Sequence, residues 1–164
     1  ARNAQPKAIL AGYSNTNEAH QLTAPSPNGA GALRTMEKAL ATAGVQSSEI
    51  DFICAHGTAT QGNDLSEGQA IQQLFGIKNH PPFASLKSYT GHTLAASGAI
   101  ESIVSCLLLQ HHFLPPNLRF ETRMKEVAIS PLQQMISDRN SRFILNNSFG
   151  FGGNDVSLVF RSIR

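Results

Sequence analysis

The chain has 164 residues, of which 41% are hydrophobic and 15% charged, and its formal net charge is +2 at pH 7. This length suits one domain with a hydrophobic core, and the weak charge without a Lys/Arg cluster excludes a basic nucleic-acid-binding surface. The longest apolar run, 103–109, is interrupted by Ser105 and is too short for a membrane span. Cys54 and Cys106 form no disulfide pattern, so a reducing cytoplasm is the simplest compartment.

The first expected element is a strand over 7–14, and no signal peptide precedes it. A core strand this close to the start suggests that the chain begins partway through something larger. A polar loop with proline and Asn-Gly turn signals follows over 15–28. Apolar residues at helical spacing then predict a helix over 31–43, which Gly44 ends.

The middle of the chain predicts a strand, a helix and a second strand. Residues 50–55 are expected to form a short buried strand. A helix over 65–75 follows, with Asp64 as its N-cap and Glu67 at the third helical position of a capping box. Two prolines then open a strand over 83–86.

The last third begins with a helix over 95–110 that is apolar on nearly all sides, which predicts burial between two layers. Residues 117–141 are polar and irregular, and strands are expected over 142–146 and 156–160 around a glycine-rich turn. Because strands alternate with helices before this final pair, the sequence predicts an α/β fold with a mixed sheet and helices on both faces.

Three polar motifs follow expected strands: HGTAT at 56–60, KSYTGHT at 87–93 and NSFGFGG at 147–153. Glycine lets a substrate approach the backbone closely, and histidine and lysine can polarise a carbonyl and move protons. In isolation, His56 fits a catalytic role and a strand-end hydrogen bond equally well. For the motif with His92, a functional site is slightly favoured over the alternative, a helix N-terminus that packs closely on a neighbouring element.

Metal and phosphate sites are disfavoured by spacing. His111 and His112 are adjacent and cannot both face one metal from a helix, and the other histidines lack a short ligand spacing. The glycine-rich turn at 149–153 is followed by a strand rather than a helix and lacks the Gly-Lys-Ser/Thr of a phosphate loop. We therefore predict no bound metal or cofactor.

Taken in this order, the motifs resemble the C-terminal half of β-ketoacyl-acyl-carrier-protein synthases (ketosynthases), the condensing enzymes of fatty-acid and polyketide synthesis. The resemblance covers essentially the whole chain. It implies a thiolase-like fold, in which two similar α/β halves stack as α-β-α-β-α layers and residues 1–164 supply the second half. It rests on Thr23-Ala24-Pro25, Asn28 to Gly31, Ala55 to Thr60, Asn63-Asp64, Glu67, Lys87, Gly91-His92-Thr93, Ala95 to Gly98 and Asn147 to Gly153.

The resemblance implies an acyltransferase reaction, the decarboxylative Claisen condensation of an acyl-cysteine with malonyl-acyl-carrier protein. The nucleophilic cysteine lies in the other half, and neither cysteine of this chain can replace it because both are buried. His56 and His92 are expected to hydrogen-bond the enolate oxygen as its charge develops. Lys87 is expected to orient His92, with Glu67 as its ionic partner and Asp64 as a further supporting residue.

The remaining implied site residues bind substrate. Thr58 and Thr60 resemble residues that hold the pantetheine arm, Phe149 belongs to the same substrate-binding set, and Phe151 resembles a gating phenylalanine whose backbone N–H helps to hold the tetrahedral oxyanion. The sequence departs from the family after the glycine pair, where Asn154-Asp155 replaces the usual Thr-Asn.

The implied partners are acyl carrier protein, the N-terminal half of the same enzyme and, for the whole protein, a second copy in a homodimer. Three alternatives to a catalytic half remain: a non-catalytic chain-length-type subunit, a folding or dimerisation module, and a metal-binding module. We expect the isolated chain to be inactive and, because its half-interface is apolar, to associate.

Overall fold

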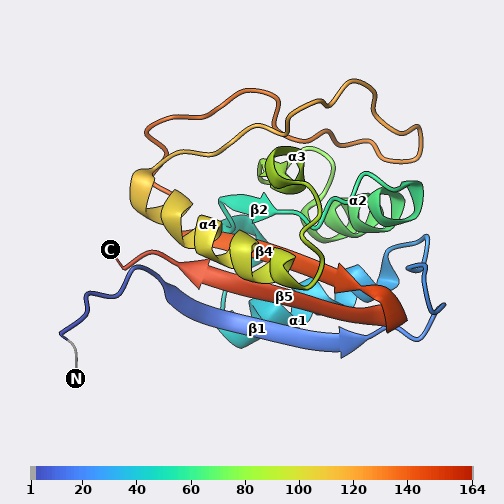
Figure 1. Cartoon of the computed structure of the whole chain (residues 1–164), viewed down its shortest axis with the longest axis horizontal. Coiled ribbons are helices and arrows are strands. Elements are labelled where there is room, and N and C mark those ends of the chain that lie inside the picture. Colours follow the sequence, from blue (N-terminus) through green and yellow to red (C-terminus); the bar gives the residue numbers. More distant parts are fainter. Residues whose placement is uncertain (1–2, 164) are drawn as a thin grey trace.

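A five-stranded mixed sheet organises residues 3–163, which are the residues that the computed structural model describes (Figure 1). The strand order is β1-β5-β4-β2-β3. Strand β2 is parallel to its neighbours β3 and β4, whereas β5 is antiparallel to β4 and β1, which confirms the predicted mixed sheet. The strands are β1 (Ile9–Asn17), β2 (Phe52–Cys54), β3 (Phe83–Ala84), β4 (Phe143–Gly150) and β5 (Asn154–Arg161).

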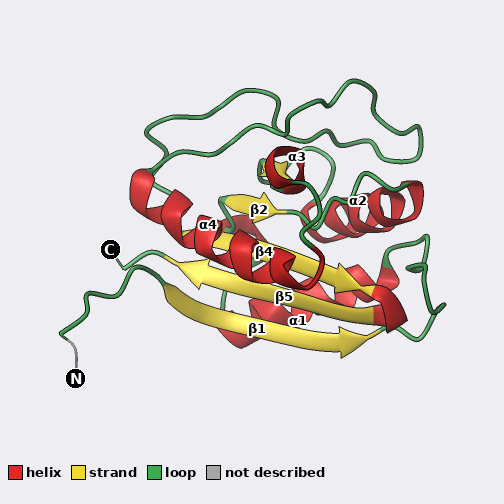
Figure 2. Cartoon of the chain, viewed as in Figure 1, coloured by secondary structure: helices red, strands yellow, loops and turns green. Residues whose placement is uncertain are grey.

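Helices cover both faces of this sheet, as predicted (Figure 2). Alternate strand residues point to opposite faces, so Ile53 and Leu145 pack in the core cluster that includes residues of α1 and α2, while Phe52 and Ile144 pack with those of α4. The helices are α1 (Ala30–Ala43), α2 (Gln61–Phe75), the single turn α3 (Lys87–Thr90) and α4 (Ser97–His111).

Two helix starts show what the sequence predicted and what it missed. Helix α1 and its left-handed Gly44 cap are as predicted. Helix α2 begins four residues earlier than expected, with Thr60 as its N-cap, so Asp64 lies in the first turn and the predicted capping box with Glu67 is wrong. The Asp64 carboxylate instead accepts a hydrogen bond from the Ala59 backbone N–H at 3.2 Å.

Helix α4 is not buried on all sides, contrary to the prediction from its composition. Leu108 and Glu101 face the sheet, whereas Ile103 is 62% exposed and Leu107 is also exposed. Among the described residues, Leu94–His111 is the one helical stretch long and apolar enough to cross a membrane by length and composition. The covering helix of a layered α/β domain meets the same criterion, and here α4 packs against β4 and β5.

The strand pair at the end of the chain forms a hairpin around the third motif. Strand β4 extends to Gly150, four residues beyond the predicted end at 146, so half of that motif lies within the strand. Residues 150–153, hereafter the glycine-rich turn, then lead into β5, which begins two residues earlier than predicted.

Close packing of β1 on α1 explains a glycine in the first strand. A Cβ at Gly12 would lie 2.6 Å from the Ala39 carbonyl oxygen and closer still to the backbone of Ala43. We predict that Gly12→Ala lowers the free energy of unfolding by about 1–3 kcal/mol, the usual cost of overpacking. Urea unfolding measures this, and Gly62→Ala on α2 is the control because a Cβ there would make only an ordinary contact, 3.9 Å from Pro25 Cδ. An unchanged midpoint for Gly12→Ala would contradict the prediction.

Candidate active site

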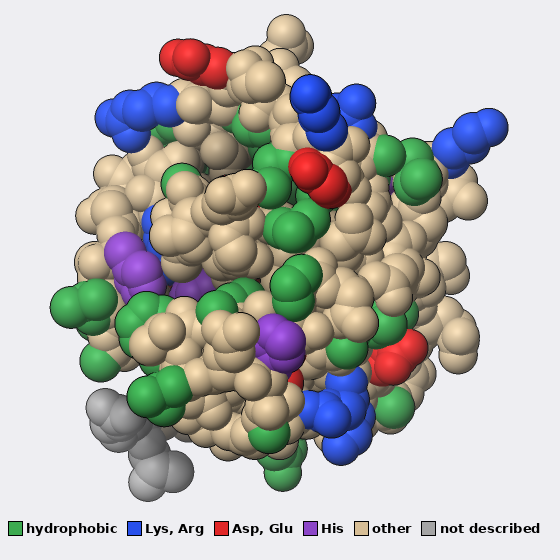
Figure 3. Space-filling view, turned by 90° about the vertical axis from the view of Figure 1, so that its right-hand side faces the viewer, with side chains coloured by type: hydrophobic (Ala, Val, Ile, Leu, Met, Phe, Trp, Pro, Cys, Tyr) green, Lys and Arg blue, Asp and Glu red, His purple; other side chains and the backbone are tan. Residues whose placement is uncertain are grey.

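The three sequence motifs meet at one end of the sheet. His56 follows β2, Lys87 and His92 follow β3, and the third motif ends β4. Because β2, β3 and β4 are parallel, their carboxyl ends lie at the same edge, where ligands bind in open α/β sheets. Figure 3 views this end of the molecule, where histidine side chains reach the surface among hydrophobic ones.

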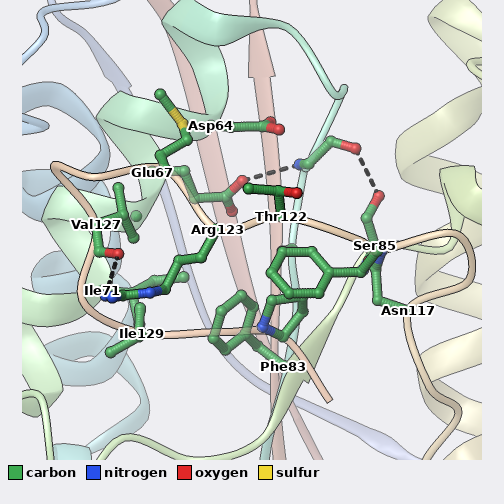
Figure 4. A pocket seen from close by; sticks show the side chains of 16 residues that line it. Asp64, Glu67, Ile71, Phe83, Ser85, Asn117, Thr122, Arg123, Val127 and Ile129 are labelled. Carbon is green, nitrogen blue, oxygen red and sulfur yellow. Dashed lines mark hydrogen bonds between the residues drawn. The ribbon is translucent and has the colours of Figure 1, made fainter. Parts of the chain in front are cut away.

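Glu67 builds the turn that presents His56. Its carboxylate oxygens accept the backbone N–H groups of His56 and Gly57, each at 2.9 Å, and its Oε1 also accepts the Asn147 side-chain amide. On the other side of the turn, the Ser85 hydroxyl donates to the Gly57 carbonyl at 2.8 Å (Figure 4). Burial raises the pKa of Glu67, and these hydrogen bonds oppose that rise. Glu67 is therefore a backbone anchor for the His56 turn.

Lys87 fixes the His56 ring. Its Nζ lies 3.2 Å from His56 Nδ1, 2.6 Å from the His56 carbonyl oxygen and 2.5 Å from Glu101 Oε1. A lysine side chain has three N–H donors and no acceptor, so these contacts use all of them. Glu101 is only 2% exposed and is the ionic partner of Lys87.

Two expectations about Lys87 are therefore wrong. Its ionic partner is Glu101 on α4, not Glu67, because Glu67 is turned towards the backbone after β2. Lys87 also contacts His56 and not His92. Sequence reasoning missed Glu101, although an acidic residue in the middle of an otherwise apolar helix signals a buried ion pair.

The hydrogen bonds of both histidines define their tautomers. Lys87 can only donate, so His56 Nδ1 is an acceptor. His92 Nδ1 is also an acceptor, because it receives the Leu94 backbone N–H at 3.1 Å, and it lies 3.0 Å from Ser97 Oγ. In the neutral imidazole the proton of each ring is then on Nε2. Among residues 3–163, neither Nε2 has a partner, so each is a free donor.

Electrostatics keeps the His56 ring neutral. Burial lowers its pKa to about 3, and the positive charge of Lys87 and the proximity of the His92 ring act in the same direction. The His56 ring lies edge-to-face with the His92 ring at 5.6 Å and 5.7 Å from the Phe149 ring. All three rings border a hollow of about 550 Å³, which is open to solvent and reaches the start of α4. Two neutral N–H donors in such a hollow can stabilise a negatively charged oxygen.

The predicted substrate-binding residues line a neighbouring hollow of about 390 Å³. Thr58 and Thr60 lie 2.9 Å apart through their hydroxyls, and His92, Phe149 and Phe151 border the same space. Phe151 is 77% exposed at the tip of the glycine-rich turn. The histidines, threonines and phenylalanines of the predicted site thus all border one or both of these hollows. Asp64, Glu67 and Lys87 border neither hollow and instead hold the backbone or ring of residues in the 56–60 motif.

The back of the site holds a smaller cavity and an inert thiol. A cavity of about 190 Å³ lies between α2 and the 117–131 segment and is bordered by Glu67, Phe83 and Arg123 (Figure 4). Cys54 is fully buried in β2, and burial raises the pKa of its thiol far above the usual range. Cys106 is half-buried on α4, and burial raises its pKa too, so neither thiol is an activated nucleophile.

Solved structures with the same fold identify the class of protein. A type II polyketide synthase ketosynthase, solved with its acyl-carrier protein and bound to the hexaketide, matches 99% of this chain and 40% of its own length at a TM-score of 0.90 and 33% identity. A ketosynthase from Xenorhabdus doucetiae in complex with its chain length factor matches 97% of this chain and 40% of its own length, at a TM-score of 0.86 and 35% identity. The fold is that of the thiolase-like ketosynthases.

Sequence relatives agree. Residues 7–121 match the family described as "Beta-ketoacyl synthase, C-terminal domain", and the chain belongs to this family. The 3-oxoacyl-[acyl-carrier-protein] synthase 2 of Staphylococcus aureus is 36% identical over 98% of this chain, and that of Rhizobium meliloti (strain 1021) is 39% identical over 98%. The chain spans 40% and 38% of the length of these two relatives.

The buried ion pair should dominate the stability of the site. We predict that Lys87→Met lowers the free energy of unfolding by about 3–5 kcal/mol, because Glu101 is left buried without its partner. Replacing both residues, Lys87→Met with Glu101→Leu, should recover most of this loss since no charge remains buried. Lys38→Met on the exposed side of α1 is the control. Equilibrium unfolding that finds the single and double variants equally destabilised would contradict the prediction.

The neutral state of His56 should persist in acid. Its pKa lies below the ordinary 6.5, so the folded protein leaves the ring uncharged where the unfolded chain protonates it. The contribution of His56 to the free energy of unfolding is therefore fully present above pH 6.5. It is lost as the pH falls from 6.5 towards about 3. NMR of the His56 ring protons should show no titration between pH 7 and about 5, whereas a midpoint near the peptide value of about 6.5 would contradict the prediction.

Proposed function

We propose that the chain is the catalytic C-terminal half of a ketosynthase that condenses an acyl-cysteine with malonyl-acyl-carrier protein. The arrangement of the two neutral histidines carries this proposal: their Nε2–H groups are uncommitted donors beside a solvent-accessible hollow. Loss of carbon dioxide from a malonyl thioester leaves an enolate oxygen, and two neutral donors stabilise that charge. His56 and His92 are the catalytic residues in this proposal.

Lys87 has a positioning role. Its three hydrogen bonds hold the His56 ring in the tautomer that donates from Nε2, and its positive charge opposes protonation of that ring. The positive charge also favours the enolate electrostatically. Glu67 and Asp64 serve the same end at the backbone, because they hold the residues that join β2 to α2.

The two hollows suit the two ends of the malonyl substrate. We assign the thioester to the histidine hollow and the pantetheine arm to the hollow with Thr58 and Thr60, whose hydroxyls can bond the amides of an extended arm. Phe151, exposed on the glycine-rich turn at the border of both hollows, is placed to control passage between them.

The nucleophile and the remaining layers come from a complementary N-terminal half. The chain spans only about two fifths of its relatives' length, and it exposes Ile103 and Leu107 on α4 and Leu94 just before α4, where Leu94 borders the histidine hollow. An apolar face of this kind is expected to be covered by a partner. A cysteine on an element that packs there would reach the hollow. Acyl carrier protein and a second copy of the enzyme are the further partners proposed.

A condensation assay tests this function. The isolated chain should form no ketoacyl product, and product from it would contradict the proposal. Supplied with the complementary half, His56→Ala and His92→Ala should each lower the condensation rate by about 10²–10³, the cost of removing one oxyanion donor. The control, His111→Ala, alters an exposed histidine at the far end of α4 and should leave the rate unchanged.

The same assay separates the catalytic half from a chain-length-type subunit. Three solved structures with this fold pair a ketosynthase with a chain length factor, which makes that subunit the main alternative. If the wild-type chain and both histidine variants support the same condensation rate, the histidines are not catalytic and the chain-length role is favoured.

A further inference from the structure

Two carboxyl groups meet beneath the glycine-rich turn. If Gly31 carried a Cβ, Asp155 Oδ2 would lie 2.7 Å from it and Glu18 Oε2 would lie closer still. Both oxygens therefore approach the same glycine, which has no side chain of its own to separate them. Asp155 is only 4% exposed and is the second residue of β5, while Glu18 directly follows β1. Both residues border the hollow with Thr58 and Thr60.

The two carboxyl groups differ in their hydrogen bonds. Glu18 Oε1 accepts the Ser26 backbone N–H at 2.9 Å, which leaves Oε2 turned towards Gly31 and Asp155. The Asp155 carboxyl has no hydrogen-bond donor among the described residues. A buried carboxylate without a donor is costly, whereas a protonated carboxyl can donate to a neighbouring carboxylate.

The charges that face Asp155 come from three packed elements. Burial raises its pKa to about 7, and the adjacent Glu18 contributes to this rise. Arg34 on α1 opposes the rise but already donates to the Asn17 carbonyl, and Glu67 on α2 adds a small further rise. The negative charge of Glu18 thus makes the ionised form of Asp155 less favourable.

The pair lies where the glycine-rich turn is fastened. The Gly152 N–H donates to the Leu22 carbonyl at 2.6 Å, the Glu18 N–H donates to the Gly153 carbonyl at 3.0 Å, and the Asn17 side-chain amide donates to the Gly152 carbonyl at 2.7 Å. These bonds tie the turn to residues 17–26, hereafter the 17–26 segment. Glu18 belongs to that segment, and Asp155 lies two residues after the end of the turn.

We propose that Glu18 and Asp155 form a proton-sharing carboxyl pair that positions the glycine-rich turn and loosens it when both groups ionise. With one proton between them, an O–H···O⁻ bond can hold the 17–26 segment against the start of β5. When that proton leaves to water, two like charges face each other in a poorly solvated place and push the segment and β5 apart. Through Phe151, loosening changes access to the histidine hollow, and only this last step rests on the proposed function.

Hydrogen exchange of the Gly152 amide reports the fastening directly, in the intact protein that carries this sequence. After correction for the intrinsic exchange rate, the protection factor of this amide should fall by about tenfold or more between pH 6 and pH 8.5. The reason is that the ratio of ionised to protonated carboxyl rises about tenfold with each pH unit. Asp155→Asn stays uncharged and should remove this fall. The control, Asp138→Asn, removes an exposed carboxylate away from the turn and should keep it.

Two further readouts make the outcome decisive. Glu18→Gln should also remove the fall in protection, since Gln can still accept the Ser26 N–H, and it covers the case in which Asp155→Asn does not fold. A ¹³C titration of the Asp155 carboxyl should give a midpoint near 7 in the wild type and a lower one in Glu18→Gln. Equal protection at both pH values in the wild type, or the same fall in Asp155→Asn, overturns the proposal. None of these measurements requires condensation activity, so failure of the proposed function is seen separately.

Discussion

The position of one buried ammonium group sets the geometry of the site. Lys87 reaches across from the end of β3 to the His56 ring after β2 and to Glu101 on α4, so its three donors join two strands and a helix. Burying a lysine is favourable only if its charge and all its donors are matched. Once Glu101 balances the charge, the remaining donors can meet only the Nδ1 and the carbonyl oxygen of His56. The tautomer of His56 then follows from the donor count, because a lysine cannot accept.

Counting hydrogen-bond donors and acceptors in the same way separates the residues that support the site from those that can react. Glu67 uses its carboxylate on two backbone N–H groups and the amide of Asn147, and the Ser85 hydroxyl is used on the backbone of the His56 turn. The two Nε2–H groups of His56 and His92 remain uncommitted within the described residues. A site whose other donors are committed stabilises charge only where its free donors point, without reorganisation at the moment of reaction.

The elements of the fold could be predicted because each follows from local patterning, and the partners of the buried charges could not. Helix α1 and its Gly44 cap came from apolar spacing and a glycine stop, and the mixed sheet came from the order of strands and helices. The start of α2 was placed too late because Asp64 resembles a cap, whereas Thr60 is the residue at which the backbone turns. The pairing of Lys87 with Glu101 depends on how α4 lies over the strand ends, which is a tertiary fact that no local spacing encodes.

The burial of α4 was predicted wrongly for the same reason, because it depends on tertiary packing. The exposed side of this helix also bears on the chemistry of the site. An apolar composition predicted burial on all sides, yet one domain has only one sheet face to offer this helix, so Ile103 and Leu107 face outward. Leu94 is exposed just before α4, and it borders the histidine hollow together with Ser97 and Gly98, the first residues of the helix. Exposed apolar surface therefore reaches the space where the free Nε2–H groups of His56 and His92 lie. A partner chain that covered Leu94 would therefore also border the hollow that contains the two histidine rings.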